Sequence, residues 1–417
     1  METMVAQSYT KVPLTKLRRY LNKHVSAEDV NYIEVTDIAA AKLSSKKISP
    51  LGKILEASGK PIALKLPEMI EDLHSMENCF FGCTTLISLA AFPSGVTSIN
   101  GCFKYCGSLT KAPAIPNGVK TMESCFEGCI GLIEAPVIAD CVTDMNCCFL
   151  GCTSLTAAPV IPNNVTDISS CFEDCSGLME APIIPSCVVY MHSCFEGCIN
   201  LTEAPVIPHG VTNMNACFLG CTGLTEAPAI PVSVTCIDHC FGGCSGLTKA
   251  PAIPRGVTDM HSCFSGCTGL TKAPRIPDGV TGMYNCFGNC TGLTEAPRIP
   301  NGVTYMGACF SSCTGLTKTP AIPDSVTNME YCFAGCTGLT EAPVIPNSVT
   351  DMNHCFLGCT GLTKVSAMPR RLTYMEDCFK GCINLTAGSI TVPAAGLEQY
   401  RENASKMGAD PAWFKSE

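Results

Sequence analysis

The sequence predicts a repeat solenoid, a right-handed stack of fourteen 23-residue repeats with short parallel strands and a small cap at each end. The marker is Cys-Phe followed by a second Cys four places after the first, and every step is 23 residues with no insertion. The first cysteines are Cys79, Cys102, Cys125, Cys148, Cys171, Cys194, Cys217, Cys240, Cys263, Cys286, Cys309, Cys332, Cys355 and Cys378. A strict short period is typical of solenoids, in which each turn contacts only its neighbours.

Identity between copies is the second observation, with positions counted from the first Cys as position 0. Position +1 is always Phe and position +7 is always Leu, while −6 is Val or Leu and −3 is Met or Ile. We expect each such side chain to stack on its own image in the next turn, so that Phe80 to Phe379 form an aromatic spine. Burial of each ring contributes about 2 kcal/mol. The expected ladder includes Cys263, Phe264, Leu270, Cys286, Phe287, Leu293, Cys309 and Phe310.

Two extended segments are predicted in each repeat. Val-Thr-x-Met alternates like a short strand, with Val inward and Thr outward, and successive strands should pair in parallel. The following Cys-Phe-x-Gly-Cys should turn tightly at its Gly. The segment Leu-Thr-x-Ala-Pro-x-Ile-Pro has two prolines that cannot donate to a ladder. We therefore expect this second side of the turn to be looser than the first.

Residues 1–72 do not repeat and are predicted to form an α/β cap on the solenoid, residues 73–394. Leu14, Leu17, Tyr20 and Leu21 fit one face of a helix, and residues 32–36 read as a strand. Ser49 and Pro50 start a second helix that ends at Gly59. Ile62, Leu64 and Leu66 alternate like another strand.

Residues 395–417 are predicted to be a helical C-terminal cap. Leu397, Tyr400, Ala404 and Met407 share a helical face, and Gly408 follows them. An open solenoid end exposes apolar side chains and strand edges, so both termini need a cover. A separate binding role for residues 1–72 is the alternative.

Composition excludes several classes of function. The net charge of −9 and the pI near 5.3 argue against nucleic-acid binding, which needs clustered Lys and Arg. No segment approaches the roughly 20 apolar residues of a membrane helix, so no membrane insertion is expected. The opening residues 1–7 lack the basic and apolar regions of a signal peptide, which predicts a soluble chain not exported by that route. A missing upstream segment stays open.

The chain has 32 cysteines, of which Cys141, Cys147, Cys187 and Cys236 lie outside the repeat pairs. The paired cysteines are expected to be small buried hydrophobes. Metal binding would require fourteen identical sites beside a constant Phe, and disulfides between in-register side chains would have poor torsion angles. The four remaining thiols are expected to be more exposed and easier to oxidise.

No catalytic centre is predicted, and no cofactor. The seven histidines are His24, His74, His192, His209, His239, His261 and His354. Those of the repeats are separated by whole turns, so they cannot form one compact triad. A Cys-His nucleophile would need one distinct exposed cysteine, and nothing in the sequence singles one out. The chain is therefore predicted not to be an enzyme.

Three sets of variable positions are candidates for a binding surface. Position −4 carries Tyr190, Tyr305, Tyr374, Asp144, Asp259 and Asp351 among others, a mixture common in contact surfaces. Position +9 carries Glu in six repeats and Lys in five, in irregular order. Arg275 and Arg298 are neighbours at position +12, where other repeats carry aliphatic residues, and could bind an anion or an acidic partner. Solvated surface rows, or chance variation at the arginines, would give the same patterns.

The repeat resembles that of the BspA-like, or Treponema pallidum-type, leucine-rich repeat family. Family repeats look like L-x-x-I-x-I-P-x-x-V-x-x-I-x-x-x-A-F-x-x-C-x-x-L, and here Cys-Phe replaces Ala-Phe and Met mostly replaces the Ile after Val. The resemblance implies an adhesin or surface antigen, secreted or on the cell surface, that binds host matrix proteins or other cells. The alternatives are a cytoplasmic structural or scaffold protein and, third, a thiol- or metal-based redox or buffer protein.

Overall fold

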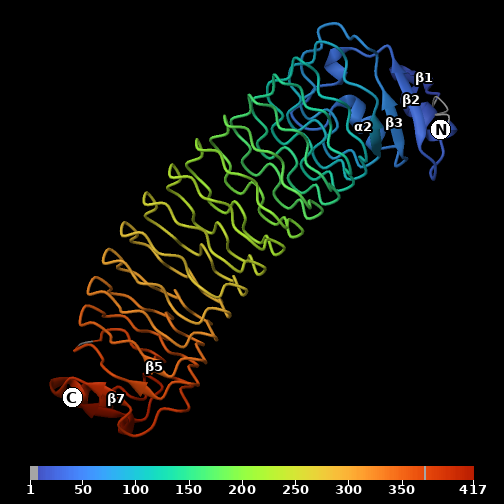
Figure 1. Cartoon of the computed structure of the whole chain (residues 1–417). Coiled ribbons are helices and arrows are strands. Elements are labelled where there is room, and N and C mark those ends of the chain that lie inside the picture. Colours follow the sequence, from blue (N-terminus) through green and yellow to red (C-terminus); the bar gives the residue numbers. More distant parts are fainter. Residues whose placement is uncertain (1–7, 371) are drawn as a thin grey trace, which may run out of the picture. The chain divides into compact units, whose positions relative to one another are not determined.

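The computed structural model describes residues 8–370 and 372–417, so the opening residues 1–7, on which the signal-peptide prediction rests, lie outside it. The chain divides into two compact units, Met1–Gly210 and Val211–Glu417. Within each unit, successive turns of the chain lie side by side, as Figure 1 shows. Each unit is a parallel-strand solenoid with few helices, which confirms the predicted fold class.

The N-terminal unit opens with a four-stranded parallel sheet in the order β1-β2-β3-β4. Its strands are β1 (Thr10–Pro13), β2 (Asn31–Thr36), β3 (Ile62–Lys65) and β4 (Leu86–Leu89). The helices between them are α1 (Leu14–His24), the 3-10 turn η1 (Ala40–Lys42) and α2 (Pro50–Glu56). The two predicted helices and two predicted strands are confirmed. The edge strand β1 was missed because it buries only Val12 well.

The first repeat joins this sheet directly. Strand β3 pairs with β4, which is the Leu-Thr side of the first repeat. Helix α2 begins at Ser49, whose hydroxyl accepts the N–H of Gly52 at 3.0 Å, as predicted for an N-cap. The Ser49 N–H donates to the carbonyl of Cys79 at 3.1 Å. This segment therefore takes the place of a preceding turn and covers the first one.

The C-terminal unit ends in a second parallel sheet, ordered β5-β6-β7-β8. It comprises β5 (Glu341–Ala342), β6 (Lys364–Val365), β7 (Ile390–Val392) and β8 (Phe414–Ser416), with η2 (Ala394–Gly396), α3 (Leu397–Glu402) and η3 (Pro411–Trp413) between them. Helix α3 is shorter than predicted and ends at Glu402. Ala404 and Met407 are buried, but they lie in turns that follow the helix. Phe379 donates its N–H to the Met407 carbonyl at 2.8 Å, so the cap imitates a further turn.

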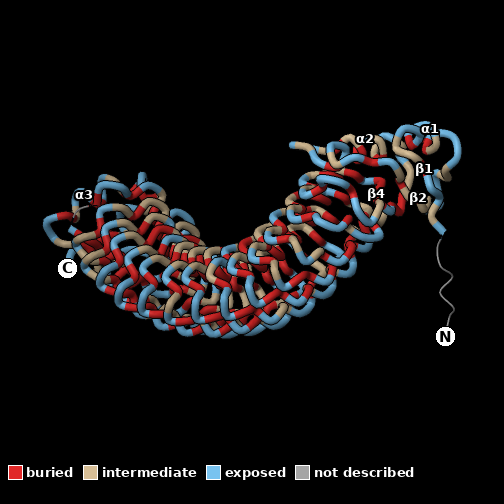
Figure 2. Tube along the Cα trace, turned by 90° about the horizontal axis from the view of Figure 1, so that it is seen from above, coloured by how far each residue is buried: buried red, intermediate tan, exposed pale blue. Residues whose placement is uncertain are grey.

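The core of each unit is a set of stacked identical side chains. The Phe rings of neighbouring turns within a unit are 5.4–5.8 Å apart and nearly parallel, as for Phe126 and Phe149 or Phe264 and Phe287. These rings, the paired cysteines and the Val at −6 are fully buried, whereas the Thr after that Val is exposed. Figure 2 shows the buried residues inside each turn and exposed ones at its corners.

The Cys-Phe turn is the most regularly hydrogen-bonded part of the repeat. Phe126 and Gly128 donate their N–H groups to the next turn, at Cys148 (2.9 Å) and Leu150 (2.7 Å), while Cys129 donates back to Phe126 at 3.0 Å. Positions −1 and +3 have positive φ in all fourteen repeats. The predicted glycine turn at +3 is confirmed, with φ of +69° at Gly128. The left-handed residue at −1 was not predicted.

The two extended segments correct the expectation about strands. Val-Thr-x-Met forms parallel bridges only at its third residue, as between Asp144 and Asp167, and not a longer strand. On the Leu-Thr-x-Ala side, most turns also form a single parallel bridge, at position +9, as between Glu134 and Ala157. The recognised strands β4, β5 and β6 lie on this side and end before its prolines. Two of them, β4 and β6, belong to repeats in which position +11 is Ala90 or Ser366 instead of proline, so pairing is longest where that proline is absent.

Candidate binding surface

The row at position −4 is a ladder of parallel bridges on the surface. In the N-terminal unit it runs through Asp144, Asp167 and Tyr190. In the C-terminal unit it continues from Gly282 and Tyr305 to Tyr374. Tyr190 and Tyr374 are 53% and 55% exposed, and Tyr305 is half-buried. The row therefore presents Tyr190 in the N-terminal unit, and Tyr305 and Tyr374 in the C-terminal unit.

The acidic members of this row have a structural role that sequence reasoning missed. The carboxylates of Asp144, Asp259 and Asp351 accept the backbone N–H two residues later, at 2.9, 3.1 and 3.0 Å. Asn213 and Asn328 do the same through their side-chain oxygens. Asp and Asn commonly close such turns. The sequence signal for this role was the recurrence of Asp and Asn at position −4, two residues before the N–H groups that they accept.

One cluster of aromatic side chains in the C-terminal unit combines residues at positions −4 and −2. Tyr305 stacks on Tyr284, with ring centroids 5.7 Å apart, and His261 lies 5.6 Å from Tyr284. The Nδ1 of His261 is 2.6 Å from the Asp259 carboxylate. Burial, together with the negative charge of Glu330, raises the pKa of the Tyr305 hydroxyl. Stacked rings with polar edges are suited to contact with another surface.

The structure brings Arg275 and Arg298 together around one carboxylate. Asp278 is 2.7 Å from the guanidinium of Arg298 and 3.7 Å from that of Arg275. The hydrogen bond and charge of Arg298 lower the pKa of Asp278. A third arginine, Arg255, lies nearby and has no ion-pair partner in the described part of the chain. These three are the only arginines between residues 20 and 369, which sequence reasoning missed.

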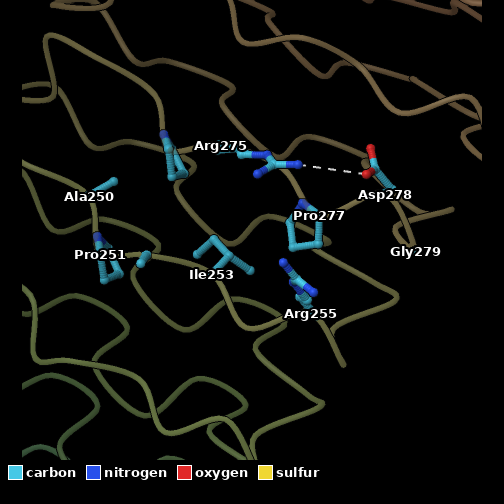
Figure 3. A pocket seen from close by; sticks show the side chains of 10 residues that line it. Ala250, Pro251, Ile253, Arg255, Arg275, Pro277, Asp278 and Gly279 are labelled. Carbon is cyan, nitrogen blue, oxygen red and sulfur yellow. Dashed lines mark ion pairs between the residues drawn. The ribbon is translucent and has the colours of Figure 1, made fainter.

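This arginine group borders a groove between neighbouring extended segments. The groove has a volume of about 690 Å³, and residues 250–253, 255, 274–275 and 277–279 line it. In Figure 3, Arg275 reaches toward Asp278, while Pro251, Ile253 and Pro277 form apolar walls and Arg255 lies below. We call this site the arginine groove. A smaller hollow of about 430 Å³, with Glu226 and Lys249 at its rim, lies between the preceding pair of segments.

Position +9 is an exposed charge row. Glu295 and Lys318 are 3.7 Å apart, and Glu341 and Lys364 are 2.8 Å apart on neighbouring turns. All four side chains are more than half exposed. Such pairs contribute about 0–1 kcal/mol, so the row affects solubility and recognition more than stability.

The cysteine ladder is chemically protected. The second Cys of a repeat donates its S–H to the Phe carbonyl of the preceding turn, at 3.0 Å from Cys267 to Phe241 and 3.0 Å from Cys290 to Phe264. Burial raises the pKa of the Cys263 and Cys267 thiols well above the usual range. No cluster of three or more His, Cys, Asp or Glu suited to a metal ion occurs among residues 8–370 and 372–417.

The four other thiols differ from one another. Cys187 is exposed, whereas Cys141, Cys147 and Cys236 are half-buried. Cys141 donates to the carbonyls of Asn117 and Val119, both at 3.1 Å. Burial, with neighbouring carboxylates, raises the pKa of Cys147 to about 11. The prediction that all four are readily available holds fully only for Cys187.

The family model for the BspA type leucine rich repeat region matches this chain repeatedly, at residues 74–202, 145–271, 213–340 and 283–404. The chain belongs to the BspA-type leucine-rich repeat family. The resemblance drawn from the Cys-Phe repeat is thereby confirmed. The comparison with curated proteins gave no match.

Solved structures of bacterial leucine-rich repeat proteins are similar to this chain. A leucine-rich repeat protein from Bacteroides ovatus is 26% identical, covers 86% of this chain and 92% of its own, and has a TM-score of 0.66. A leucine rich cell surface protein from Faecalibacterium prausnitzii is 22% identical over 80% of each chain (TM-score 0.41). The T. pallidum leucine rich repeat protein is 24% identical over 45% of this chain and 79% of its own (TM-score 0.33).

No helix in the described part of this BspA-type chain is long and apolar enough to cross a membrane.

Proposed function

We propose that this BspA-type protein is a non-catalytic binding protein that recognises proteins or surface glycans through the outer rows of its solenoid. The observation that carries this proposal is the arginine groove. Two of the three arginines of a 350-residue stretch line one hollow, and the third, Arg298, is paired with Asp278 in its wall, in a chain whose net charge is −9. Arginine is enriched at the energetic centres of protein interfaces and matches carboxylate and sulfate groups.

The groove is suited to an acidic partner because its positive charge is incompletely neutralised. Asp278 accounts for one unit of negative charge among Arg255, Arg275 and Arg298. The proline and isoleucine walls supply rigid apolar contact beside these cations. Repeat proteins generally act through such extended surfaces, and the resemblance suggests matrix proteins of a host as partners.

We further propose that the protein acts at the cell surface, as expected for an adhesin. The alternative of a cytoplasmic scaffold was favoured partly by the free-thiol interpretation of the cysteines. The burial and raised pKa of ladder thiols such as Cys267 remove much of that preference, because a protonated buried thiol resists oxidation in either compartment.

Binding of the whole protein to immobilised extracellular-matrix proteins and sulfated glycans tests the proposal. The variant Arg255→Gln/Arg275→Ala/Arg298→Ala should lose at least about tenfold in affinity, since removing arginine anchors costs more than 1 kcal/mol at many interfaces. The matched control Lys380→Gln/Lys406→Gln/Lys415→Gln removes the same charge elsewhere in the C-terminal unit. An equal loss of affinity in both variants would mean that the groove contributes only its positive charge and is not a specific site. Absence of binding to every surface by the wild-type protein would reject the proposal.

A further inference from the structure

The N-terminal unit carries a row of exposed aliphatic side chains on four consecutive turns. At position +12, Val137, Val160, Ile183 and Val206 are 77%, 88%, 91% and 88% exposed. We call this row the aliphatic stripe. Single exposed apolar side chains are ordinary, but four in register form a continuous patch, and such patches mark interaction sites.

The fold itself does not require aliphatic side chains in this row. The same position is Ala229, Ala252 or Ala321 in turns of the C-terminal unit, and Arg275 and Arg298 in two others. Because the side chains point into solvent, they add little to the core. The stripe is therefore a surface feature of one unit, independent of the arginine groove in the other.

The backbone holds the stripe rigidly. Each of its residues follows a proline and precedes a buried isoleucine, as Val160 lies between Pro159 and Ile161, and Ile183 between Pro182 and Ile184. Proline fixes the backbone dihedral φ before the exposed residue, and the buried isoleucine fixes the residue after it. A surface already ordered in this way loses little conformational entropy when a partner binds.

Negative charge surrounds the stripe. Residues 121–210 contain eleven Asp and Glu and no Lys or Arg. Glu134, Glu180 and Glu203 are exposed three residues before members of the stripe, and Glu180 is paired in register with Glu203. The surface thus combines apolar contacts with a row of carboxylates, which meets a cation only at its first member, where Glu134 is in register with Lys111. A matching partner supplies apolar side chains flanked by cations.

The spacing of the stripe fits a helix. The Phe rings of the same four turns are 5.4, 5.8 and 5.8 Å apart, so four aliphatic side chains one per turn span roughly 17 Å. Side chains at i, i+3 and i+4 of an α-helix are about 5–6 Å apart, and about eleven residues of helix cover that span. Same-face residues of an extended peptide are spaced more widely, at about 7 Å. A helix lying along the stripe could therefore contact successive turns with successive anchors.

From exposure, rigidity, charge and spacing together, we propose that the aliphatic stripe binds a cationic amphipathic helix of a partner protein. A second copy of this chain fits less well, because apposed stripes would bring carboxylates such as Glu180 and Glu203 together. Anionic lipid surfaces would be repelled by the same groups. The proposal concerns a site distinct from the arginine groove, so either can fail alone.

The probe is a fluorescent 18-residue synthetic helix with Leu at i, i+3, i+4 and i+7 and Lys at the flanking positions. Its affinity for the full chain is measured by fluorescence anisotropy at physiological salt. Val137→Ala/Val160→Ala/Ile183→Ala/Val206→Ala should weaken binding at least about tenfold, and Glu134→Gln/Glu180→Gln/Glu203→Gln should do the same. A peptide with Glu in place of Lys should not bind.

Matched controls keep the test specific. Val344→Ala and Glu295→Gln change the same two rows in the C-terminal unit and should leave affinity within about twofold. Circular dichroism checks that each variant is folded. The proposal is overturned if the wild-type chain does not bind the probe saturably, or if the four-alanine variant binds equally well. A dimer, or binding to anionic vesicles, that the four-alanine variant abolishes would also overturn it.

Discussion

At the scale of single residues, the stacked Phe explains why the repeat tolerates no change at position +1. Phe287 is fully buried, with its ring centroid 5.7 Å from those of Phe264 and Phe310. A smaller side chain would leave a cavity between two rings that cannot collapse, because both neighbouring turns hold their own hydrogen bonds.

Phe287→Ala should therefore cost about 3–5 kcal/mol of unfolding free energy. Urea denaturation followed by circular dichroism measures this loss as a lower midpoint. Phe287→Leu, which refills most of the volume, should cost clearly less. An unchanged midpoint for the alanine variant would mean that the Phe stack is not part of the stable core.

The left-handed residues at position +3 predict an effect of backbone conformation alone. Gly358 has φ of +71°, and an added Cβ would meet no atom within 4 Å. Gly358→Ala should still cost about 1–2 kcal/mol, because an L-residue is strained there. Gly358→Asn should cost less, since Asn289 occupies the same position with φ of +58°. Equal unfolding midpoints for alanine and wild type would contradict the assigned conformation.

Thiol chemistry gives a pH-dependent prediction. The thiolate is the reactive form, so a raised pKa delays alkylation to higher pH. With its pKa near 11, Cys147 has about one thiolate in a thousand at pH 8, and burial also raises the pKa of Cys236. Iodoacetamide at pH 8, followed by peptide mass spectrometry, should modify exposed Cys187 first. Cys147 should react faster as pH rises toward 11. Early modification of Cys267 in folded protein would contradict a buried ladder.

At the scale of elements, the chain shows what its sequence could and could not predict. Period and constant residues were enough for the solenoid, the buried Val, Phe and Cys positions and the glycine turn at +3. The length of pairing was not predictable, because strand propensity in Val-Thr-x-Met competes with the tight turn that follows. The same turn places non-glycine residues such as Ser124 and Tyr331 at positive φ, which propensity argues against.

The candidate site was predicted less completely than the fold. Tyr190 and Tyr374 are exposed where the row at −4 was expected, and Arg275 and Arg298 are indeed neighbours around a shared group. Arg255 and Asp278 complete the arginine groove. They are at position +15, three residues after the position of Arg275 and Arg298, and the sequence analysis did not connect the two positions. Their proximity depends on how the proline segments of two turns pack, which spacing alone does not specify.

The row at −4 makes a prediction about stability as well as recognition. Asp351 accepts the N–H of Asn353 at 3.0 Å and the Asn328 amide at 2.9 Å. Asp351→Ala should cost about 1 kcal/mol, typical of a lost cap. Asp351→Asn can still accept the N–H and should be nearly neutral. If thermal or urea midpoints for both variants matched wild type, Asp351 would be free for recognition alone.

At the scale of the whole molecule, contacts between neighbouring, nearly identical turns stabilise each unit. At each end of the chain, a segment that does not repeat makes the backbone hydrogen bond that a further turn would make. Ser49 donates its N–H to Cys79, and Phe379 donates to Met407, as Phe donates to the next Cys within the repeats. The predicted division into caps 1–72 and 395–417 and solenoid 73–394 is our proposal for the organisation of the chain. The outer rows remain available for binding because the core lies inside the turns.

The central claim is that this BspA-type protein presents those rows to partners outside the cell. The most direct measurement is protease treatment of intact source cells, with the protein's peptides quantified in the released fraction and a cytosolic enzyme as lysis control. The account predicts release of repeat peptides while the control stays inside. Protection of the protein until the cells are lysed would contradict the claim and favour the scaffold alternative.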